Sequence, residues 1–297
     1  IGRARIHIYV PVDPELMAAS LGKLANDKPL ITSTVHRLIK MMADQGFEVE
    51  FSPEGYSRQQ DNFDFTTDLI RHAIAAGATV INCPDTIGGA SHFQGEAYFV
   101  NNMAKHKAIM EQEFPNKEII WSMHCHNDFG TALENSLNGV FRGIARQIEG
   151  CINGVGERAG NVALEQCIMM IRQFGQATHL AQAYHTNIDI QYLKQASDFI
   201  AERMLPRQPH SPIVGKNSAS HTSGGHINAI LKNPLAYQPF DPRDVGSEIS
   251  FVFGPLSGSN HAQQILAKFA YQCTDSEKVA VTQAIKDCYA DRSKGFT

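Results

Sequence analysis

Two histidines set two residues apart are the clearest candidates for chemistry in this 297-residue chain. His124 and His126 stand in the segment MHCHNDFG, directly after the apolar run EIIW. Residues i and i+2 of a strand point to the same face, so both rings could bind one metal ion. Alternatively, one ring hydrogen-bonds within a sheet while the other is solvated. The spacing alone does not decide between these interpretations.

Further polar side chains follow other strand-like segments. In α/β barrels the reactive groups lie where strands end, on the loops at the carboxyl face. Convergence of many such groups on one mouth favours the metal interpretation of the histidine pair. Besides the two histidines, the strand-end residues are His7, Ser52, Glu54, Asp85, Thr86, Asn153, Glu157 and Asn161.

Several of these positions also have a purely structural interpretation. The hydroxyls of Ser52 and Thr86 could bind a substrate carboxylate, or could satisfy backbone groups in the turns after their strands. The segment NGVGERAGN (153–161) could be a simple glycine-rich turn, and it lacks the lysine of a phosphate-binding loop. Glu157, however, brings a charge that such a turn does not need.

The elements that must position these residues alternate regularly along the first part of the chain. Five strand-like segments are each followed by a segment of helical periodicity, with short connections. This alternation predicts a parallel sheet with helices outside, and the unit length fits a (β/α)8 barrel better than an open doubly wound sheet. The strand-like segments are 5–10, 47–52, 79–86, 117–126 and 146–154.

Beyond Gly175 the alternation stops. Within a long segment rich in Pro, Gly, Ser and His, His226 could be solvated or could act as an acid or base on a lid. We expect the carboxyl-terminal part of a barrel over residues 1–176 and a helical linker or lid subdomain over residues 177–297. The second part is predicted to contain a helix at 188–204, an irregular segment at 206–230, and helices at 261–271 and 276–290.

Composition excludes several classes of protein. The formal net charge of -4 and the pI near 6.4 argue against binding to nucleic acid or to an anionic membrane. Six cysteines without a CxxC pair argue against a structural zinc site. No apolar stretch is long enough to span a membrane, and the first residues lack a signal-peptide pattern. A cytoplasmic, reducing location is therefore expected.

Several segments, in the same order, resemble those of the 2-isopropylmalate synthase family. They are RIHIYV, VEFSPE, INCPDTIG, HCHNDFGTALENSL, INGVGERAGNVALE and HTSGGHINAILKNPLAYQPFDPRDVG, and the similarity runs from about residue 4 to 265. The resemblance implies a TIM barrel that uses a divalent metal for the Claisen condensation of acetyl-CoA with 2-oxoisovalerate in leucine biosynthesis. Homocitrate, citramalate or re-citrate synthase, or a related metal-dependent lyase, are the alternatives.

The resemblance also implies roles for individual residues. His124, His126 and Asn161 would bind the metal, either Mn²⁺, Zn²⁺ or Mg²⁺. Glu54 would lie in the 2-oxo acid pocket with His7, Ser52 and Thr86, and Thr86 would hold the substrate carboxylate. Glu157 would lie near the acetyl-CoA thioester and help position or activate the base. His226 and Tyr237 would reach the barrel of a neighbouring subunit in a homodimer.

The chain departs from the family pattern at its beginning. The family's first strand carries an Asp–x–x–Leu–Arg–Asp–Gly-type motif, with a further metal ligand and an arginine, and no such motif occurs here. We therefore expect a fragment that begins at the fourth strand, with an incomplete metal site and little or no catalysis. An inactive module that binds metal or CoA is the non-enzymatic alternative.

Overall fold

The chain divides into two compact units, Ile1–Thr186 and Asn187–Thr297, and each is described by itself. The structure is a computed structural model that describes residues 4–252, 258–268 and 270–288. The boundary between the units lies C-terminal to residue 176, where the barrel was expected to end.

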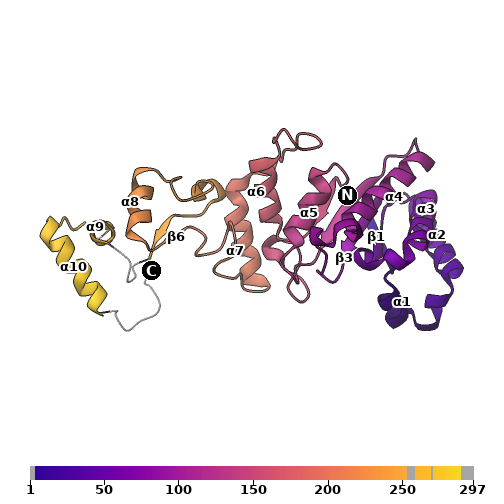
Figure 1. Ribbon diagram of the computed structural model, residues 1–297, viewed down its shortest axis with the longest axis horizontal. Helices are drawn as coiled ribbons and strands as arrows, with labels where there is room; N and C mark the ends of the chain where they lie inside the picture. Colours follow the sequence, from indigo (N-terminus) through magenta and orange to yellow (C-terminus); the bar gives the residue numbers. More distant parts are fainter. Residues whose placement is uncertain (1–3, 253–257, 269, 289–297) are drawn as a thin grey trace. The chain divides into compact units, whose positions relative to one another are not determined.

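The first unit is built on a five-stranded parallel sheet (Figure 1). Neighbours in the sheet are neighbours in sequence, whereas a doubly wound sheet reverses its strand order at a switch point. This order is that of a (β/α) barrel, and the predicted fold class is confirmed. The strands are β1 (Arg5–Pro11), β2 (Glu48–Glu54), β3 (Val80–Asp85), β4 (Ile120–Cys125) and β5 (Gln147–Glu149).

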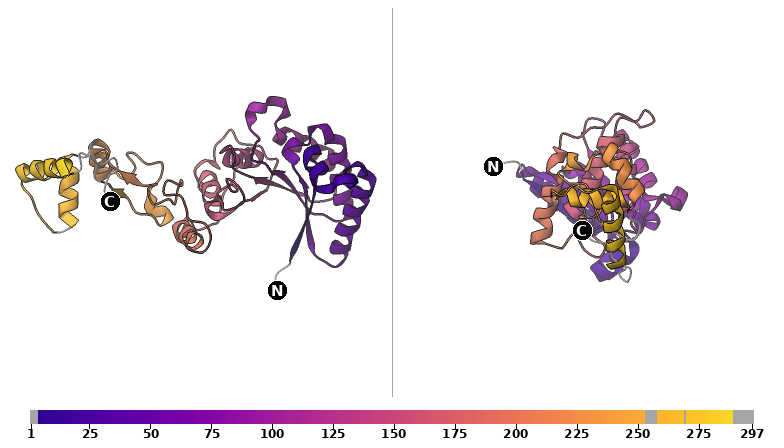
Figure 2. Two further views of the ribbon diagram at one scale, coloured as in Figure 1. Left: turned by 90° about the horizontal axis from the view of Figure 1, so that it is seen from below. Right: turned by 90° about the vertical axis from the view of Figure 1, so that its left-hand side faces the viewer.

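Helices follow the strands and cover one face of the sheet (Figure 2). The α-helices are α1 (Pro14–Leu21), α2 (Lys28–Asp44), α3 (Phe63–Ala76), α4 (Phe99–Glu113), α5 (Ala132–Phe141) and α6 (Leu164–Phe174). Short 3-10 helices are η1 (Gly22–Asn26), η2 (Tyr56–Arg58), η3 (Gln60–Asn62), η4 (His92–Ala97) and η5 (Ile152–Gly154).

Alternation along the strands separates an apolar face from a polar one. In β2, Val49 and Phe51 are fully buried in the core beneath the helices. Glu48, Glu50 and Ser52 point to the opposite face, because successive side chains of a strand alternate. This polar face, which we call the inner face, carries the candidate site.

Close packing fixes the strand that carries the histidine pair. The glycine at position 139 lets α5 approach β4, because a Cβ there would lie 2.5 Å from the Sδ atom of Met123. Met123 and Trp121 of the same strand are almost completely buried. The outer face of β4 is therefore held in the core, while its alternate residues remain on the inner face.

The second unit is mainly helical, with one small sheet. It contains η6 (Ile190–Tyr192), α7 (Leu193–Arg203), β6 (Ser220–His221), α8 (Gly224–Lys232), η7 (Pro242–Val245), β7 (Ser250–Phe251), α9 (Ser259–Lys268) and α10 (Asp275–Cys288). β6 and β7 pair in parallel.

The prediction of an irregular segment over 206–230 is wrong in its last part. Residues from Gly224 form α8, in which Ile227 and Ile230 are buried at helical spacing. The two glycines that begin this helix have low helix propensity and obscured it in the sequence. The predicted closing helix 276–290 corresponds to α10, and its residues 289 and 290 lie outside the described residues.

No helix among the described residues is long and apolar enough to cross a lipid bilayer.

Candidate metal centre and adjoining pocket

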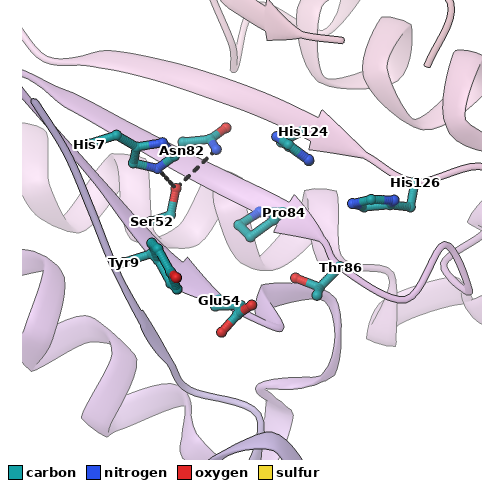
Figure 3. A pocket seen from close by; sticks show the side chains of 9 residues that line it. All are labelled: His7, Tyr9, Ser52, Glu54, Asn82, Pro84, Thr86, His124 and His126. Atoms are coloured by element: carbon teal, nitrogen blue, oxygen red, sulfur yellow. Dashed lines mark hydrogen bonds between the residues drawn. The ribbon is translucent and has the colours of Figure 1, made fainter. Parts of the chain in front are cut away.

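A small pocket of about 160 Å³ lies on the inner face, toward the carboxyl ends of the strands (Figure 3). The predicted substrate-binding residues, both histidines and Glu54 line it together. The full lining is His7, Tyr9, Ser52, Glu54, Asn82, Pro84, Thr86, His124 and His126.

The histidine pair lies at the end of β4, with ring centroids 5.3 Å apart. β4 ends at Cys125, and backbone hydrogen bonds hold the next residue in place. The N–H of His126 donates to the carbonyl of Asp85 at 3.2 Å. The N–H of Val162 donates to the carbonyl of Cys125 at 2.9 Å. The backbone at the end of β4 is thus supported by the end of β3 and by the loop after β5.

Asn161 lies beside His126 through an antiparallel backbone bridge. Its Nδ2 donates to the carbonyl of Val155 at 2.8 Å, which orients the amide. A Cβ at Gly156 would overlap that amide, so glycine is required there. The Oδ1 of Asn161 and the Nδ1 of His126 are buried and have no hydrogen-bond partner among the described residues. Because buried polar atoms are rarely left unpaired, these donors fit a metal ion.

The ring of His124 is oriented by a carboxylate. Its Nδ1 is hydrogen-bonded to the Oε2 of Glu149 at 3.0 Å, which leaves Nε2 for an ion. Burial, together with the nearby His124 and Arg158, lowers the pKa of His126. The neutral form of imidazole is the one that binds metals.

A second group of possible ligands lies on the inner face. His7, Glu50 and Glu149 each offer one ligand atom, and these atoms lie within 4.8 Å of one another. All three already have partners. His7 Nε2 is hydrogen-bonded to Ser52 Oγ at 2.7 Å, Glu50 is paired with Arg5 at 3.0 Å, and Glu149 Oε2 is hydrogen-bonded to His124 at 3.0 Å. The histidine pair differs from this group because His126 Nδ1 and Asn161 Oδ1 have no partner among the described residues, and its metal-binding role stays a prediction.

Two hydroxyl groups of the pocket, those of Ser52 and Thr86, are already partly engaged. Ser52 Oγ accepts a hydrogen bond from Asn82 Nδ2 at 3.0 Å and is hydrogen-bonded to His7 (Figure 3). Thr86 Oγ1 accepts from the N–H of Gly55 at 2.9 Å, so it satisfies a turn backbone group, one of the two interpretations considered. An accepting hydroxyl still carries its own proton, which Thr86 can donate to a substrate oxygen.

Glu54 is the acidic residue that lines the pocket itself. Burial raises the pKa of its carboxyl group. A carboxylate whose pKa is raised is a better proton acceptor, as a general base requires.

Comparison with known proteins decides the family. Residues 1–200 match the HMGL-like family, and residues 213–294 match the homocitrate synthase post-HMGL domain-like family. A 2-isopropylmalate synthase from Saccharolobus solfataricus is 36% identical over 286 residues, which cover 96% of this chain and 68% of that protein. The chain belongs to the 2-isopropylmalate synthase family.

Other relatives are longer than this chain. The 2-isopropylmalate synthase of Afipia carboxidovorans is 36% identical over 296 residues, and the chain spans 53% of its length. Among solved structures, hydroxymethylglutaryl-CoA lyase from Pseudomonas aeruginosa has a TM-score of 0.50 at 16% identity, covering 67% of this chain and 62% of that one. That similarity concerns the fold alone.

In this member of the 2-isopropylmalate synthase family, Glu157 lies outside the pocket lining, with 88% of its side chain exposed. Its neighbour Arg158, in a left-handed backbone conformation (φ 55°), pairs with Asp128 at 2.9 Å and donates to the carbonyl of Thr86 at 2.7 Å. Arg158 thus ties together the loops that follow β3, β4 and β5. Glu157 remains a candidate for contact with a larger substrate at the mouth.

His226 and Tyr237 belong to the second unit. Their rings are stacked with centroids 3.9 Å apart, and the ring of His221 lies 6.3 Å from that of His226. Burial lowers the pKa of His221. The three rings therefore form one local cluster on β6, α8 and the segment after α8.

Sequence reasoning missed several residues of the inner face. Tyr9 and Asn82 line the pocket, while Glu50 and Glu149 contact residues that line it. The period-two alternation that placed Ser52 and His124 also indicates these four positions. Tyr9, Glu50 and Asn82 lie within strands, and Glu149 lies within the longer strand expected over 146–154, so a search of the expected strand ends does not include them.

Proposed function

We propose that the protein to which this chain belongs, in the full length that its gene encodes, catalyses the condensation of acetyl-CoA with 2-oxoisovalerate, the 2-isopropylmalate synthase reaction of leucine biosynthesis. One observation carries the proposal. Buried ligand atoms of His126 and Asn161, which have no partner in the described part of the chain, lie beside a small pocket that contains hydroxyls and a carboxyl group of raised pKa. The family membership supports the same reaction class.

The metal centre would consist of His124, His126 and Asn161. Two nitrogens and one amide oxygen suit Zn²⁺ or Mn²⁺, and Mg²⁺ would depend more on oxygen ligands. A bound divalent ion would supply Lewis-acid polarisation of the substrate's keto group.

The pocket residues would bind and orient the 2-oxo acid. The Thr86 hydroxyl would donate to the substrate carboxylate while its oxygen keeps the hydrogen bond from Gly55. Ser52, held by His7 and Asn82, would present its oxygen at a fixed position.

Glu54 would act as the base for carbon–carbon bond formation. Its carboxylate would take one proton from the acetyl methyl group, and the resulting carbanion would attack the keto carbon of the 2-oxo acid. The keto oxygen would become an alkoxide and take up a proton to give the hydroxyl group, which restores the Glu54 carboxylate if that proton comes from Glu54. Water would then hydrolyse the thioester and release CoA as a thiol. Glu157 would help to position the thioester at the mouth.

We further propose that a homodimer completes the site, with His226 and Tyr237 of one subunit reaching the barrel of the other. Both rings are polar, partly exposed groups that are able to transfer or hold a proton.

The reaction can be tested by following thiol release from acetyl-CoA, using the protein as its gene encodes it. We expect release with 2-oxoisovalerate and Mn²⁺, abolished by EDTA, and slower release with 2-oxoglutarate or pyruvate. Glu54→Gln should lower kcat by about 10²–10⁴-fold, while the inner-face control Glu48→Gln retains activity. Cleavage of hydroxymethylglutaryl-CoA without any condensation would instead assign a lyase.

A further inference from the structure

We propose that Glu149 is a positioning residue of the metal centre, which holds His124 in the one tautomer that can bind the ion through Nε2. The inference rests on the proposed metal centre and adds a residue that neither the family motifs nor the strand-end rule identified.

Strand pairing places the two side chains together. His124 and Glu149 are partners in the parallel register of β4 and β5, so both project from the inner face side by side. The Nδ1 of His124 lies 3.0 Å from the Oε2 of Glu149. Both side chains are largely buried, with 29% and 24% of their surfaces exposed, so water competes little for this hydrogen bond.

The chemistry of the pair fixes the tautomer. A carboxylate only accepts hydrogen bonds, so Nδ1 of His124 must be the donor. The neutral ring then carries its lone pair on Nε2, which is the nitrogen left to bind a metal. A carboxylate partner also increases the basicity of the ring and thereby strengthens its bond to an ion.

Glu149 is itself held firmly enough to perform this role. Its Oε2 also accepts from Asn82 Nδ2 at 3.0 Å, and its Oε1 accepts from Gln147 Nε2 at 3.2 Å. Asn82 in turn donates to Ser52 in the pocket. The carboxylate therefore connects the substrate pocket to the metal centre through one polar network.

The two histidines differ in how they are held. His124 has a carboxylate on its Nδ1, whereas the Nδ1 of His126 is the buried atom without a partner among the described residues. The geometry therefore assigns Nε2 of His124 and Nδ1 of His126 to the ion. Only the His124 bond depends on Glu149.

Calorimetric titration with Mn²⁺ tests the inference on the whole chain. We expect one saturable site in the wild type and roughly 10–100-fold weaker binding in Glu149→Gln. A Gln side chain has the same shape, but its amide can donate to Nδ1 and so favour the wrong tautomer. Glu48→Gln is the matched control, since Glu48 is an inner-face carboxylate that is paired with Arg5 and has a similar exposure of 33%.

A double variant separates positioning from direct ligation. If Glu149 acts through His124, adding Glu149→Gln to His124→Ala will weaken Mn²⁺ binding no further. If Glu149 is itself a ligand, as in the group with His7 and Glu50, the two losses will add. Additive losses would overturn the inference.

Nitrogen-resolved NMR of the metal-free protein gives a readout that a merely structural role would not change. The His124 signals should show a protonated Nδ1 and a bare Nε2 in the wild type, and a mixture of tautomers in Glu149→Gln. If the wild type binds Mn²⁺ and His124→Ala weakens it, but Glu149→Gln behaves like Glu48→Gln, the positioning role is wrong. If the wild type shows no saturable site, the metal centre itself fails, and the positioning role fails with it.

Discussion

At the scale of single residues, the two neighbouring carboxyl groups of Glu50 and Glu149 on the inner face have pKa values shifted in opposite directions. Burial and a hydrogen bond with Glu149 raise the pKa of Glu50, to about 8. Burial also acts to raise the pKa of Glu149, but hydrogen bonds from His124 and Glu50 outweigh it and lower the value to about 2. The pair therefore holds one proton on Glu50 and one negative charge on Glu149, where His124 requires it.

The buried histidine His106, which lies outside the candidate site, makes the stability of the first unit pH-dependent. The ring is fully buried, with hydrogen bonds to Tyr56 Oη at 2.6 Å and Thr67 Oγ1 at 2.9 Å. Burial lowers its pKa to about 4, against 6.5 for the free side chain. Between these pH values the unfolded chain binds a proton that the native ring does not, so native stability is full above pH 6.5 and falls toward pH 4.

The expected loss of unfolding free energy from this ring is up to about 3 kcal/mol between pH 6.5 and pH 4. Urea unfolding of the wild type and of His106→Gln across that range measures it as a difference in slope. His106→Gln should be less stable at pH 7 but should decline less steeply on acidification. If the unfolding free energy of wild type and of His106→Gln fell with the same slope between pH 6.5 and pH 4, His106 would not be the source of the pH dependence.

At this scale, the sequence indicates the candidate metal ligands but not the residue that orients one of them. His124, His126 and Asn161 were recognisable because their residue types and spacing carry metal chemistry. Glu149 was not, since a single glutamate within a strand is unremarkable until the register of β4 and β5 is known. Cross-strand partnership depends on pairing between distant segments, which local pattern does not specify.

At the scale of elements, the contact of α5 with β4 sets the position of the histidine strand. A methyl group at position 139 would collide with the fully buried Met123. Gly139→Ala should therefore destabilise the protein, because an overpacking cost of about 1–3 kcal/mol exceeds the gain in helix propensity of up to about 1 kcal/mol.

The sign of that effect should reverse when the collision is removed. In a Met123→Ala background, itself destabilised by about 2–5 kcal/mol, Gly139→Ala should be neutral or stabilising, since only the propensity gain remains. Chemical denaturation of the two single variants and the double variant closes the cycle. The same destabilisation by Gly139→Ala in both backgrounds would show that the helix does not rest on this contact.

Elements of the first unit were predictable because their periodicity is strong. In each of the five strands, apolar and polar residues alternate or the residues are continuously apolar. Glycine marks the end of a helix before a strand, as Gly77 (φ 117°) does after α3. The helix at Gly224–Lys232 was missed because its first residues are poor helix formers. Burial of Ile227 and Ile230 offsets that cost, and burial of this kind is not visible in local propensity.

At the scale of the whole molecule, the proposed sharing of the site between subunits can be tested by complementation. Glu54→Gln removes the base from the barrel, and His226→Ala removes a ring from the second unit. Each variant alone should be inactive. Mixed under conditions that exchange subunits, they should recover roughly a quarter of the wild-type rate, because half of the dimers are mixed and each mixed dimer has one intact site.

Mixing two barrel variants, Glu54→Gln with Thr86→Ala, provides a control. If each site takes its barrel residues from one subunit, this mixture recovers no activity. Recovery only in the first mixture supports the shared site, whereas no recovery in either mixture would mean that each site is completed within one subunit.

The position of the metal ion is the most direct test of the central claim. Crystals of the protein soaked in Mn²⁺ would reveal the ion by its anomalous scattering. We predict a peak about 2.0–2.3 Å from Nε2 of His124, Nδ1 of His126 and Oδ1 of Asn161. A peak between His7, Glu50 and Glu149, or no peak on the inner face, would contradict the account.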